Sequence, residues 1–337
     1  MKVLIYIGYQ KKELTYQDFI DGNEIGGTEI TALKLSEELS KYGFEMYFGG
    51  QVEPGYHNNV EWLDLVGCSS KHFDVSISAS YLHFIGTIDS KHHIFWWHNT
   101  DFYSWKDGKD LYGVQYLNNH RLNKHIALTN WHKDVIRDKY NINIPIDVIG
   151  NAIDRKTFNK KHKVRDSFIY SSAAERGLYR LLHMWPEVLL ELPNATLNVF
   201  CPGYSQPNVE EWPKGVTYHG TVSQEYLHEW QAKSEYWLHP SDYEETYCIT
   251  ALEMQYAGVI PVTTNVAALN EVVGNRGFLL DPSETNQSFI SIIKELKRSS
   301  TLRDTFRNKG YQWAKQQSWP VRILEWVKLL KEHEDEN

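Results

Sequence analysis

Short apolar runs alternate with amphipathic stretches along most of the chain, which is typical of an α/β protein. Residues 2–8 form an apolar run that ends in glycine and predict a buried strand. In residues 26–43, Ala32, Leu35 and Leu39 recur at helical spacing and predict an amphipathic helix. A strand, a glycine-bearing loop and a helix in this order open a doubly wound α/β domain.

The same alternation continues to the C-terminus in two similar halves. Further strands are predicted at residues 74–80, 93–99, 124–130 and 146–151 in the first half, and at 167–172, 195–203, 215–220, 235–241 and 259–264 in the second. Helices are predicted at residues 131–140, 176–192, 224–234, 247–258 and 318–330. The pattern therefore predicts an α/β fold of two Rossmann-like, doubly wound domains.

The length of 337 residues exceeds what one hydrophobic core usually serves, which also favours two domains. Residues 154–166 are polar, basic and poor in large apolar side chains, so we expect a linker there. The domains are then residues 1–153 and residues 167–317. We expect a C-terminal helix, within residues 318–337, to pack back on the first domain.

Charge and composition exclude several classes of protein. A net charge of −8 argues against a nucleic-acid partner, because such proteins usually carry a basic excess. Cys68, Cys201 and Cys248 lack metal-type spacing, so we expect reduced thiols, no metal and a cytoplasmic location. No apolar run reaches the roughly 18 residues of a membrane span, although peripheral membrane contact through basic residues stays open.

Two stretches that each precede a predicted helix have the chemistry of phosphate sites. Gly26 and Gly27 allow close approach to a helix N-terminus, but they also fit a plain flexible turn. Arg176 follows a predicted strand, and its guanidinium fork matches phosphate oxygens. The alternative for Arg176 is a surface arginine that pairs with Glu175 or with a neighbouring helix.

The stretch EETYCITALE places Glu245 just before a predicted helix and Glu253 eight residues later. With a helix starting near Tyr247, the backbone N–H groups of Tyr247, Cys248 and Ile249 would lack intrahelical partners. A diphosphate fits such a helix N-terminus, and the two carboxylates suit hydroxyl groups on either side of it. A solvated capping acid with a second, half-buried glutamate explains the spacing equally well.

Five segments together resemble retaining glycosyltransferases of family 4 and their relatives. The stretch ETYCITALEMQYAGVIPVTT is similar to the E-x7-E signature of that family. GVTYHGTVSQEYLHEWQAKSEYWLHPS, LNEVVGNRGFLLDP, VIGNAIDRKTF and GGTEITALKLSEELSKYG resemble other family segments and occur in the expected order. The resemblance covers most of the chain and implies a GT-B fold with a cleft between two domains.

The resemblance also implies transfer of a hexose from a nucleoside-diphosphate sugar with retention, without a metal or cofactor. Glu253 would hold the donor ribose, Glu245 the transferred sugar and Arg176 the leaving phosphates. Thr246, Tyr247, Cys248 and Ile249 would supply diphosphate-binding amides, and Gly26 and Gly27 would close over the phosphates. The acceptor would be a saccharide, a lipid-linked molecule or a protein.

His98, in FWWHNTD, matches a histidine that the family often places near the reacting sugar, so we predict a catalytic role shared with Glu245 and Arg176. A buried histidine of the core is the alternative. Trp97, Tyr103 and Trp131 are candidates for stacking on acceptor sugar rings.

The chain departs from the family pattern in three places, one of which is Ala152, where the family often has glycine. Arg176 is the only plausible phosphate cation in its segment, where the family has two. Thr246-Tyr247-Cys248 replaces the usual Gly-Phe-Gly. An epimerase-like or phosphorylase-like GT-B enzyme and a non-catalytic sugar-nucleotide binding protein therefore stay open. An NAD-dependent oxidoreductase is disfavoured because the GxGxxG fingerprint is absent after the first strand.

Overall fold

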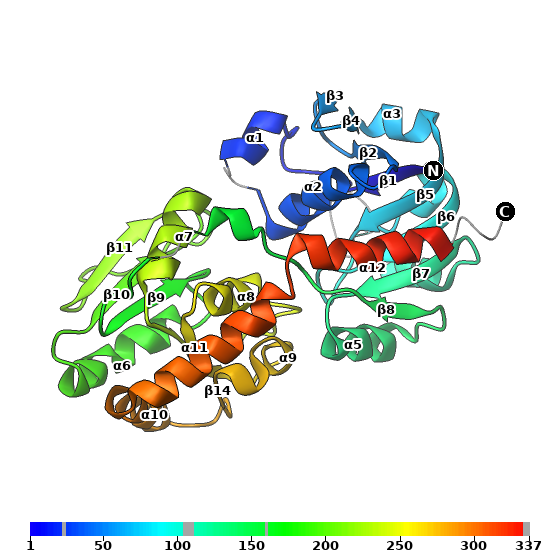
Figure 1. Cartoon of the computed structure of the whole chain (residues 1–337). Helices are drawn as coiled ribbons and strands as arrows, with labels where there is room; N and C mark the ends of the chain where they lie inside the picture. Colours follow the sequence, from blue (N-terminus) through cyan, green and yellow to red (C-terminus); the bar gives the residue numbers. More distant parts are fainter. Residues whose placement is uncertain (22–24, 104–110, 159–160, 333–337) are drawn as a thin grey trace. The chain divides into compact units, whose positions relative to one another are not determined.

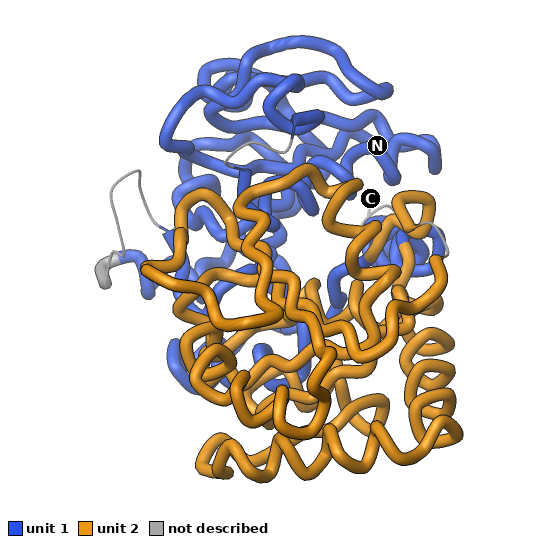
Figure 2. Tube along the Cα trace, turned by 90° about the vertical axis from the view of Figure 1, so that its left-hand side faces the viewer, with its two compact units in different colours: residues 1–152, 319–337 blue, residues 153–318 orange. Residues whose placement is uncertain are grey.

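The computed structural model describes residues 1–21, 25–103, 111–158 and 161–332. The chain forms two compact units, which Figure 2 shows in different colours, and each unit has its own β-sheet. Unit 1 comprises residues 1–152 and 319–337, and unit 2 comprises residues 153–318. The predicted fold of two Rossmann-like α/β domains is therefore confirmed.

Unit 1 is built on an eight-stranded sheet with the order β3-β4-β2-β1-β5-β6-β7-β8 (Figure 1). All neighbouring strands pair in parallel except β3 and β4. The order reverses between β1 and β5, which places the usual ligand-binding edge at their carboxyl ends. The strands are β1 Lys2–Tyr6, β2 Glu45–Gly49, β3 Gly55–His57, β4 Val60–Leu63, β5 His72–Ala79, β6 Asp89–Trp96, β7 Leu122–Ala127 and β8 Ile146–Val148.

The helices of unit 1 connect these strands, and the C-terminal helix returns to the same unit. Trp326 of this last helix lies 4.9 Å from Trp96 between ring centroids, and both rings are almost fully buried. Burial of such large side chains holds the helix against the sheet. The helices are α1 Tyr16–Asp21, α2 Gly27–Ser40, α3 Leu65–Ser70, α4 Phe84–Thr87, η1 Leu111–Asn118, α5 Asn130–Tyr140 and α12 Trp319–Glu332.

Unit 2 has a six-stranded, fully parallel sheet with the order β11-β10-β9-β12-β13-β14 (Figure 1). Its strands are β9 Ser167–Ser171, β10 Thr196–Phe200, β11 Val216–Gly220, β12 Tyr236–His239, β13 Ile260–Thr264 and β14 Phe278–Leu280. Its helices are η2 Arg155–Thr157, α6 Leu178–Glu191, α7 Gln224–Lys233, α8 Ile249–Tyr256, α9 Leu269–Val273, η3 Gly274–Arg276, α10 Asn286–Arg298 and α11 Ser300–Lys315.

The core of unit 2 lies where α6 and α10 cover one face of this sheet. Trp185 of α6 packs edge-on against Phe168 of β9, with 5.4 Å between ring centroids. Phe289 and Ile293 of α10 belong to the same fully buried cluster. The helical periodicity of residues 176–192 already indicated this buried face, because Leu181, Trp185 and Val188 recur at core-facing positions.

Among the differences from the sequence-based expectation, one concerns strands of unit 1 and another concerns the linker. β2, β3 and β4 come from residues 45–63, for which the pattern predicted no element, because these strands are short and contain few β-branched residues. The segment expected as a linker packs on unit 2. Lys163 Nζ donates to Ala257 O at 2.7 Å, and Val164 N donates to Lys233 O at 2.8 Å.

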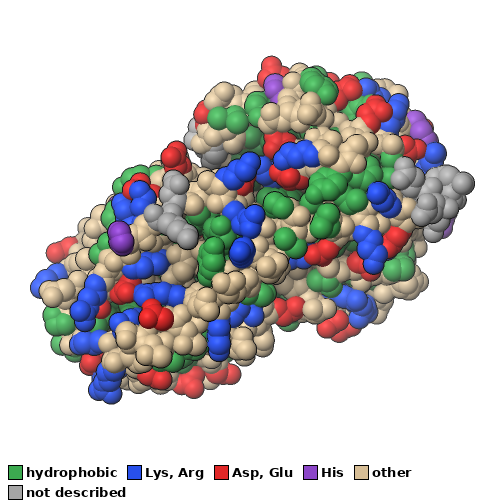
Figure 3. All heavy atoms as spheres, viewed as in Figure 1, with side chains coloured by type: hydrophobic (Ala, Val, Ile, Leu, Met, Phe, Trp, Pro, Cys, Tyr) green, Lys and Arg blue, Asp and Glu red, His purple; other side chains and the backbone are tan. Residues whose placement is uncertain are grey.

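Charged side chains of both signs are scattered over the face drawn in Figure 3. Among the residues that the structure describes, no helix is both long and apolar enough to cross a membrane.

Unit 1 buries four histidines in neutral form, which predicts sensitivity to acid. Burial lowers the pKa of His93, His125 and His132 to about 4 and that of His98 to about 3. In an unfolded chain these side chains titrate near pH 6.5. Below that pH the unfolded state therefore binds more protons, and each histidine removes up to roughly 1.4 kcal/mol of stability per pH unit.

We expect the melting temperature, measured by calorimetry, to fall steadily from pH 7 to pH 5. His93→Asn removes one titrating ring and should make this fall shallower by about a fifth, since His239 of unit 2, whose pKa burial lowers to about 3, contributes alongside the four histidines of unit 1. A melting temperature that does not change over this range would contradict the assignment of neutral, buried histidines.

Candidate functional site

An ion pair at the carboxyl edge of the unit 2 sheet joins two of the predicted site residues. Arg176 lies in the loop after β9, and Glu245 lies in the loop after β12. These neighbouring strands run parallel, so their following loops meet at one edge. Arg176 Nη1 donates to Glu245 Oε1 at 2.7 Å, and the guanidinium carbon lies 4.1 Å from the ring centroid of Tyr243.

Both charges of this pair are largely removed from water. The side chains of Arg176 and Glu245 are 26% and 14% exposed. Burial raises the pKa of Glu245, while Arg176 acts in the opposite direction. Burial disfavours the charged guanidinium of Arg176, but Glu245 and Tyr243 more than compensate and raise its pKa. The alternative of a surface arginine paired with Glu175 is wrong, because Glu175 accepts a hydrogen bond from Ser205 instead.

The glycine after Arg176 fixes the backbone that carries the guanidinium. Gly177 caps the N-terminus of α6 with φ of +102°, in a region that side chains with a Cβ rarely adopt. A Cβ there would lie 2.8 Å from Pro240 O, in the loop that leads to Glu245. The close approach of these two backbones is what lets the arginine reach the carboxylate.

The helix after Glu245 begins two residues later than the sequence predicted. α8 starts at Ile249, and Cys248 precedes it in the left-handed region with φ of 68° and ψ of 77°. The first turn of the helix therefore comprises Ile249, Thr250 and Ala251, whereas the sequence predicted a start at Tyr247. The Ala251 N–H already bonds to Cys248 O at 3.1 Å. Glycine would adopt this conformation without the strain that a Cβ causes.

Glu253 lies in the second turn of α8, and helix α7 supports its carboxylate. Gln231 Nε2 donates to Oε2 of Glu253 at 3.0 Å, and Gln224 Nε2 donates to Oε1 at 3.2 Å. His228 Nε2 lies 3.5 Å from Oε1. The ring of His228 is in turn stacked on Phe158, with 3.9 Å between centroids.

Sequence reasoning missed these three supporting residues. Gln224, His228 and Gln231 recur at i, i+4 and i+7, so they form one stripe along α7. A polar stripe on the buried side of a helix contradicts the usual amphipathic pattern. That contradiction is the signal by which the sequence could have identified them.

Gly26 and Gly27 lie in unit 1, at the start of α2. The carboxylate of Glu29 folds back on this helix end and accepts hydrogen bonds from the backbone N–H groups of Gly26 and of Glu29 itself. In a capping box, the bond from the N-cap N–H to the glutamate three residues later is one of two bonds, and it is the one that Gly26 and Glu29 make here. An approaching phosphate would compete with Glu29 for the Gly26 amide.

His98 also lies in unit 1, two residues after the end of β6, and is 7% exposed. Its imidazole lies 4.3 Å from the ring of Trp96, and burial makes it neutral near pH 7.

Trp97 is fully buried and donates from Nε1 to His125 Nδ1 at 3.0 Å, so the prediction that it stacks on a sugar is wrong. Tyr103 is 39% exposed and stacks on Tyr81.

Residues 167–298 match the family model described as Glycosyl transferases group 1. This group 1 segment runs from β9 to the end of α10 and contains Arg176, Glu245 and Glu253. The chain is also 34% identical over 104 residues to O-antigen chain mannosyltransferase B of Escherichia coli. The match covers 31% of this chain and only 27% of that relative.

Solved structures of low sequence identity share the fold. Sucrose-phosphate synthase from Thermosynechococcus elongatus aligns over 100% of both chains with a TM-score of 0.76 and 12% identity. HepE of Anabaena, solved in complex with UDP-glucose, aligns over 98% of this chain and 100% of its own with a TM-score of 0.70 and 13% identity. The fold of this chain is therefore the GT-B fold of glycosyltransferases.

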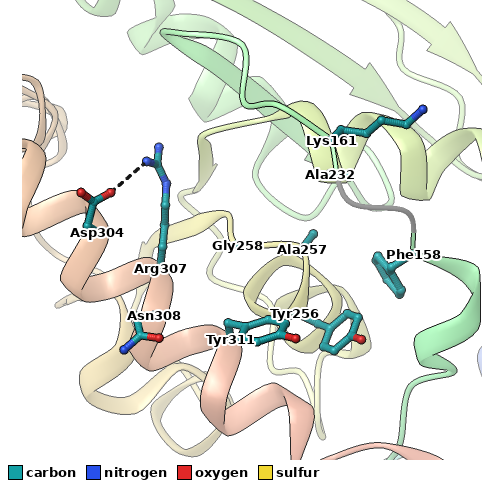
Figure 4. A pocket seen from close by; sticks show the side chains of 10 residues that line it. All are labelled: Phe158, Lys161, Ala232, Tyr256, Ala257, Gly258, Asp304, Arg307, Asn308 and Tyr311. Carbon is teal, nitrogen blue, oxygen red and sulfur yellow. Dashed lines mark ion pairs between the residues drawn. The ribbon is translucent and has the colours of Figure 1, made fainter.

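A cavity of about 460 Å³ in unit 2 is lined by Tyr256, Ala257 and Gly258 at the C-terminal end of α8 (Figure 4). Tyr256 and Tyr311 contribute their rings, and Phe158 forms another wall. The cavity thus shares Phe158 with the support of Glu253. Across the described part of the chain, no group of three or more His, Cys, Asp or Glu side chains is arranged to hold a metal ion.

The left-handed conformation of Cys248 predicts an unusual order of stability among variants. Cys248→Gly should leave the melting temperature of the protein equal or slightly higher, because glycine adopts this conformation without the cost of roughly 1 kcal/mol. Cys248→Val should lower it, since a β-branched side chain tolerates positive φ least well. Thermal unfolding followed by circular dichroism measures both, and a valine variant as stable as the glycine variant would contradict the conformation.

Proposed function

We propose that this protein is a retaining glycosyltransferase that moves a hexose from a nucleoside-diphosphate sugar to an acceptor hydroxyl without a metal ion. The observation that carries the proposal is the partly buried Arg176–Glu245 ion pair beside the N-terminus of α8. It unites a cation, a carboxylate and a helix N-terminus within the group 1 segment.

The donor diphosphate would bind at the start of α8, where backbone N–H groups and the helix dipole favour an anion. Arg176 would turn from Glu245 to the phosphates and balance the charge that grows on the leaving group. Glu245, released from the arginine, would then accept hydrogen bonds from hydroxyls of the transferred sugar. Glu253 would accept hydrogen bonds from the ribose hydroxyls on the other side of the diphosphate.

The reaction would exchange one bond for another at the anomeric carbon. The bond from that carbon to the diphosphate breaks, and its electron pair leaves with the diphosphate. The acceptor oxygen attacks the same face, and its proton passes to the departing phosphate oxygen. This arrangement needs charge stabilisation and positioning rather than a protein nucleophile.

The comparisons support this proposal from two directions. HepE was solved with UDP-glucose, and the Escherichia coli relative is a mannosyltransferase, so both nucleotide-sugar binding and hexose transfer occur among similar proteins. Carried to this chain, they favour a nucleotide sugar as donor. We also propose His98 as a residue near the reacting sugar and Gly26 and Gly27 as backbone that approaches the phosphates.

Nucleotide binding is the first test. We expect at least one of UDP, GDP and ADP to raise the melting temperature in a thermal-shift assay, with about 2.7 kcal/mol of stabilisation at 100 times Kd. Arg176→Ala and Glu253→Ala should lose this response.

Arg180→Ala is the matched control for the arginine, because Arg180 lies on α6 and bonds to Glu284 O at 2.6 Å and to Asn286. It should keep the nucleotide response. A wild-type protein that no nucleoside diphosphate stabilises would refute the donor site.

Turnover tests the role of Glu245. With the donor found in that panel, Glu245→Gln should lower kcat about 100-fold, because the sugar is then held out of its reactive position. Glu244→Gln removes the exposed neighbouring carboxylate and should leave kcat unchanged. The assay is release of nucleoside diphosphate with identification of the glycosylated acceptor by mass spectrometry, and an unaltered rate for Glu245→Gln would exclude its contact with the sugar.

A further inference from the structure

The carboxylate of Glu253 is held from one side by a single helix. Gln231 binds one carboxylate oxygen at 3.0 Å, and Gln224 binds the other at 3.2 Å. The Glu253 side chain is 13% exposed, so little solvent competes for these contacts. Both supporting amides come from α7, which makes the orientation of the carboxylate depend on that helix.

His228 completes the stripe and fixes the amide of Gln224. The Gln224 amide nitrogen lies 2.7 Å from His228 Nε2 and 3.2 Å from Glu253 Oε1, so its two N–H groups serve the ring and the carboxylate. Phe158 packs flat on the imidazole, with 22° between the planes. The amide therefore has a fixed position without any ligand.

The count of lone pairs leaves room for a ligand with two hydroxyls. A carboxylate accepts about four hydrogen bonds, two on each oxygen. Gln224 uses one site on Oε1, and Gln231 uses one site on Oε2. One site on each oxygen stays available for a donor, which is the number that two adjacent hydroxyls of one ring require.

The burial of Gln231 shows that this support is built into the core of unit 2. Gln231 is 0% exposed, and its Oε1 atom has no hydrogen-bond partner. A buried amide oxygen without a partner costs free energy, and the bond that the amide nitrogen makes to a charged acceptor offsets part of that cost. In the described structure, the side-chain bond that this nitrogen makes is the one to Glu253.

We propose that Gln231 and Gln224 are positioning residues that aim Glu253 at both ribose hydroxyls, so that α7 sets the preference for ribonucleotide over deoxyribonucleotide donors. The inference rests on the proposed function, since it concerns the nucleoside end of the same donor site. It adds a selectivity for ribonucleotides that Glu253 by itself does not provide. An unsupported carboxylate can rotate and accept a hydrogen bond from either ribose hydroxyl alone, so it would bind the deoxy analogues nearly as well.

The test compares the nucleoside diphosphate that binds best with its 2′-deoxy and 3′-deoxy analogues by isothermal titration calorimetry. We expect the wild-type protein to bind the ribonucleotide on the order of 10-fold or more tightly than either analogue, as for one lost bond to a charged acceptor. In Gln231→Met the ratio of the affinity for the ribonucleotide to the affinity for each deoxy analogue should fall toward 1, mainly because the ribonucleotide binds more weakly. Gln224→Met, at an exposed position, should show a smaller fall and provides a second variant whose folding is not at risk.

Gln255→Met is the matched control. Gln255 is another fully buried glutamine of unit 2, but its amide nitrogen donates to Ala251 O and Val272 O rather than to Glu253. This variant should keep the wild-type ratio even if its melting temperature falls. A merely structural effect of losing a buried amide would thus lower stability without changing the ratio.

The outcomes separate the two proposals. A wild-type protein that binds no nucleoside diphosphate would overturn the proposed function. Binding without discrimination against the deoxy analogues, or an unchanged ratio in both Gln231→Met and Gln224→Met, would overturn the positioning role of α7 and leave the donor site intact.

Discussion

The pairing of Arg176 with Glu245 is the interaction on which the candidate site depends. Each residue follows a strand, and the two strands are neighbours in a parallel sheet at the point where the strand order reverses. A partly buried charge without a partner is costly, so the two loops stabilise each other in the absence of a ligand. An anionic ligand that offers Arg176 an alternative partner would free Glu245, which couples phosphate binding to the availability of the carboxylate.

Helix α8 connects the two ends of this site and is itself fixed at both termini. Cys248 turns the chain into the helix through a left-handed conformation, and Lys163 binds the carbonyl of Ala257 where the helix ends. Burial lowers the pKa of Lys163 to about 7, because its ammonium group lies against unit 2 and donates to Ala257 O and Gln231 O, whereas the residues on either side of it are exposed. A helix held in this way keeps Glu253 at a constant distance from the Arg176–Glu245 pair.

Much of the fold and part of the site could be predicted from residues close in sequence. The strand before Arg176, the glycine after it and the spacing of Glu245 and Glu253 are local patterns with local physical causes. The start of α8 at Ile249 was missed because the left-handed turn at Cys248 is a property that side-chain periodicity does not reveal. Burial of Trp97 and the capping of α2 by Glu29 were missed because both depend on packing and on backbone geometry.

The sequence by itself determined the alternation of strands and helices, the two α/β domains and the identity of the charged residues that follow the strands of unit 2. These follow from hydrophobic periodicity, glycine positions and side-chain chemistry, all of which act over a few residues. Only the tertiary structure decided that Arg176 meets Glu245 across 69 positions and that α7 supports Glu253 across 22 to 29. Those contacts arise from the order of strands in a sheet and the packing of helices on it, and pairings so distant in sequence leave no periodic trace in the chain.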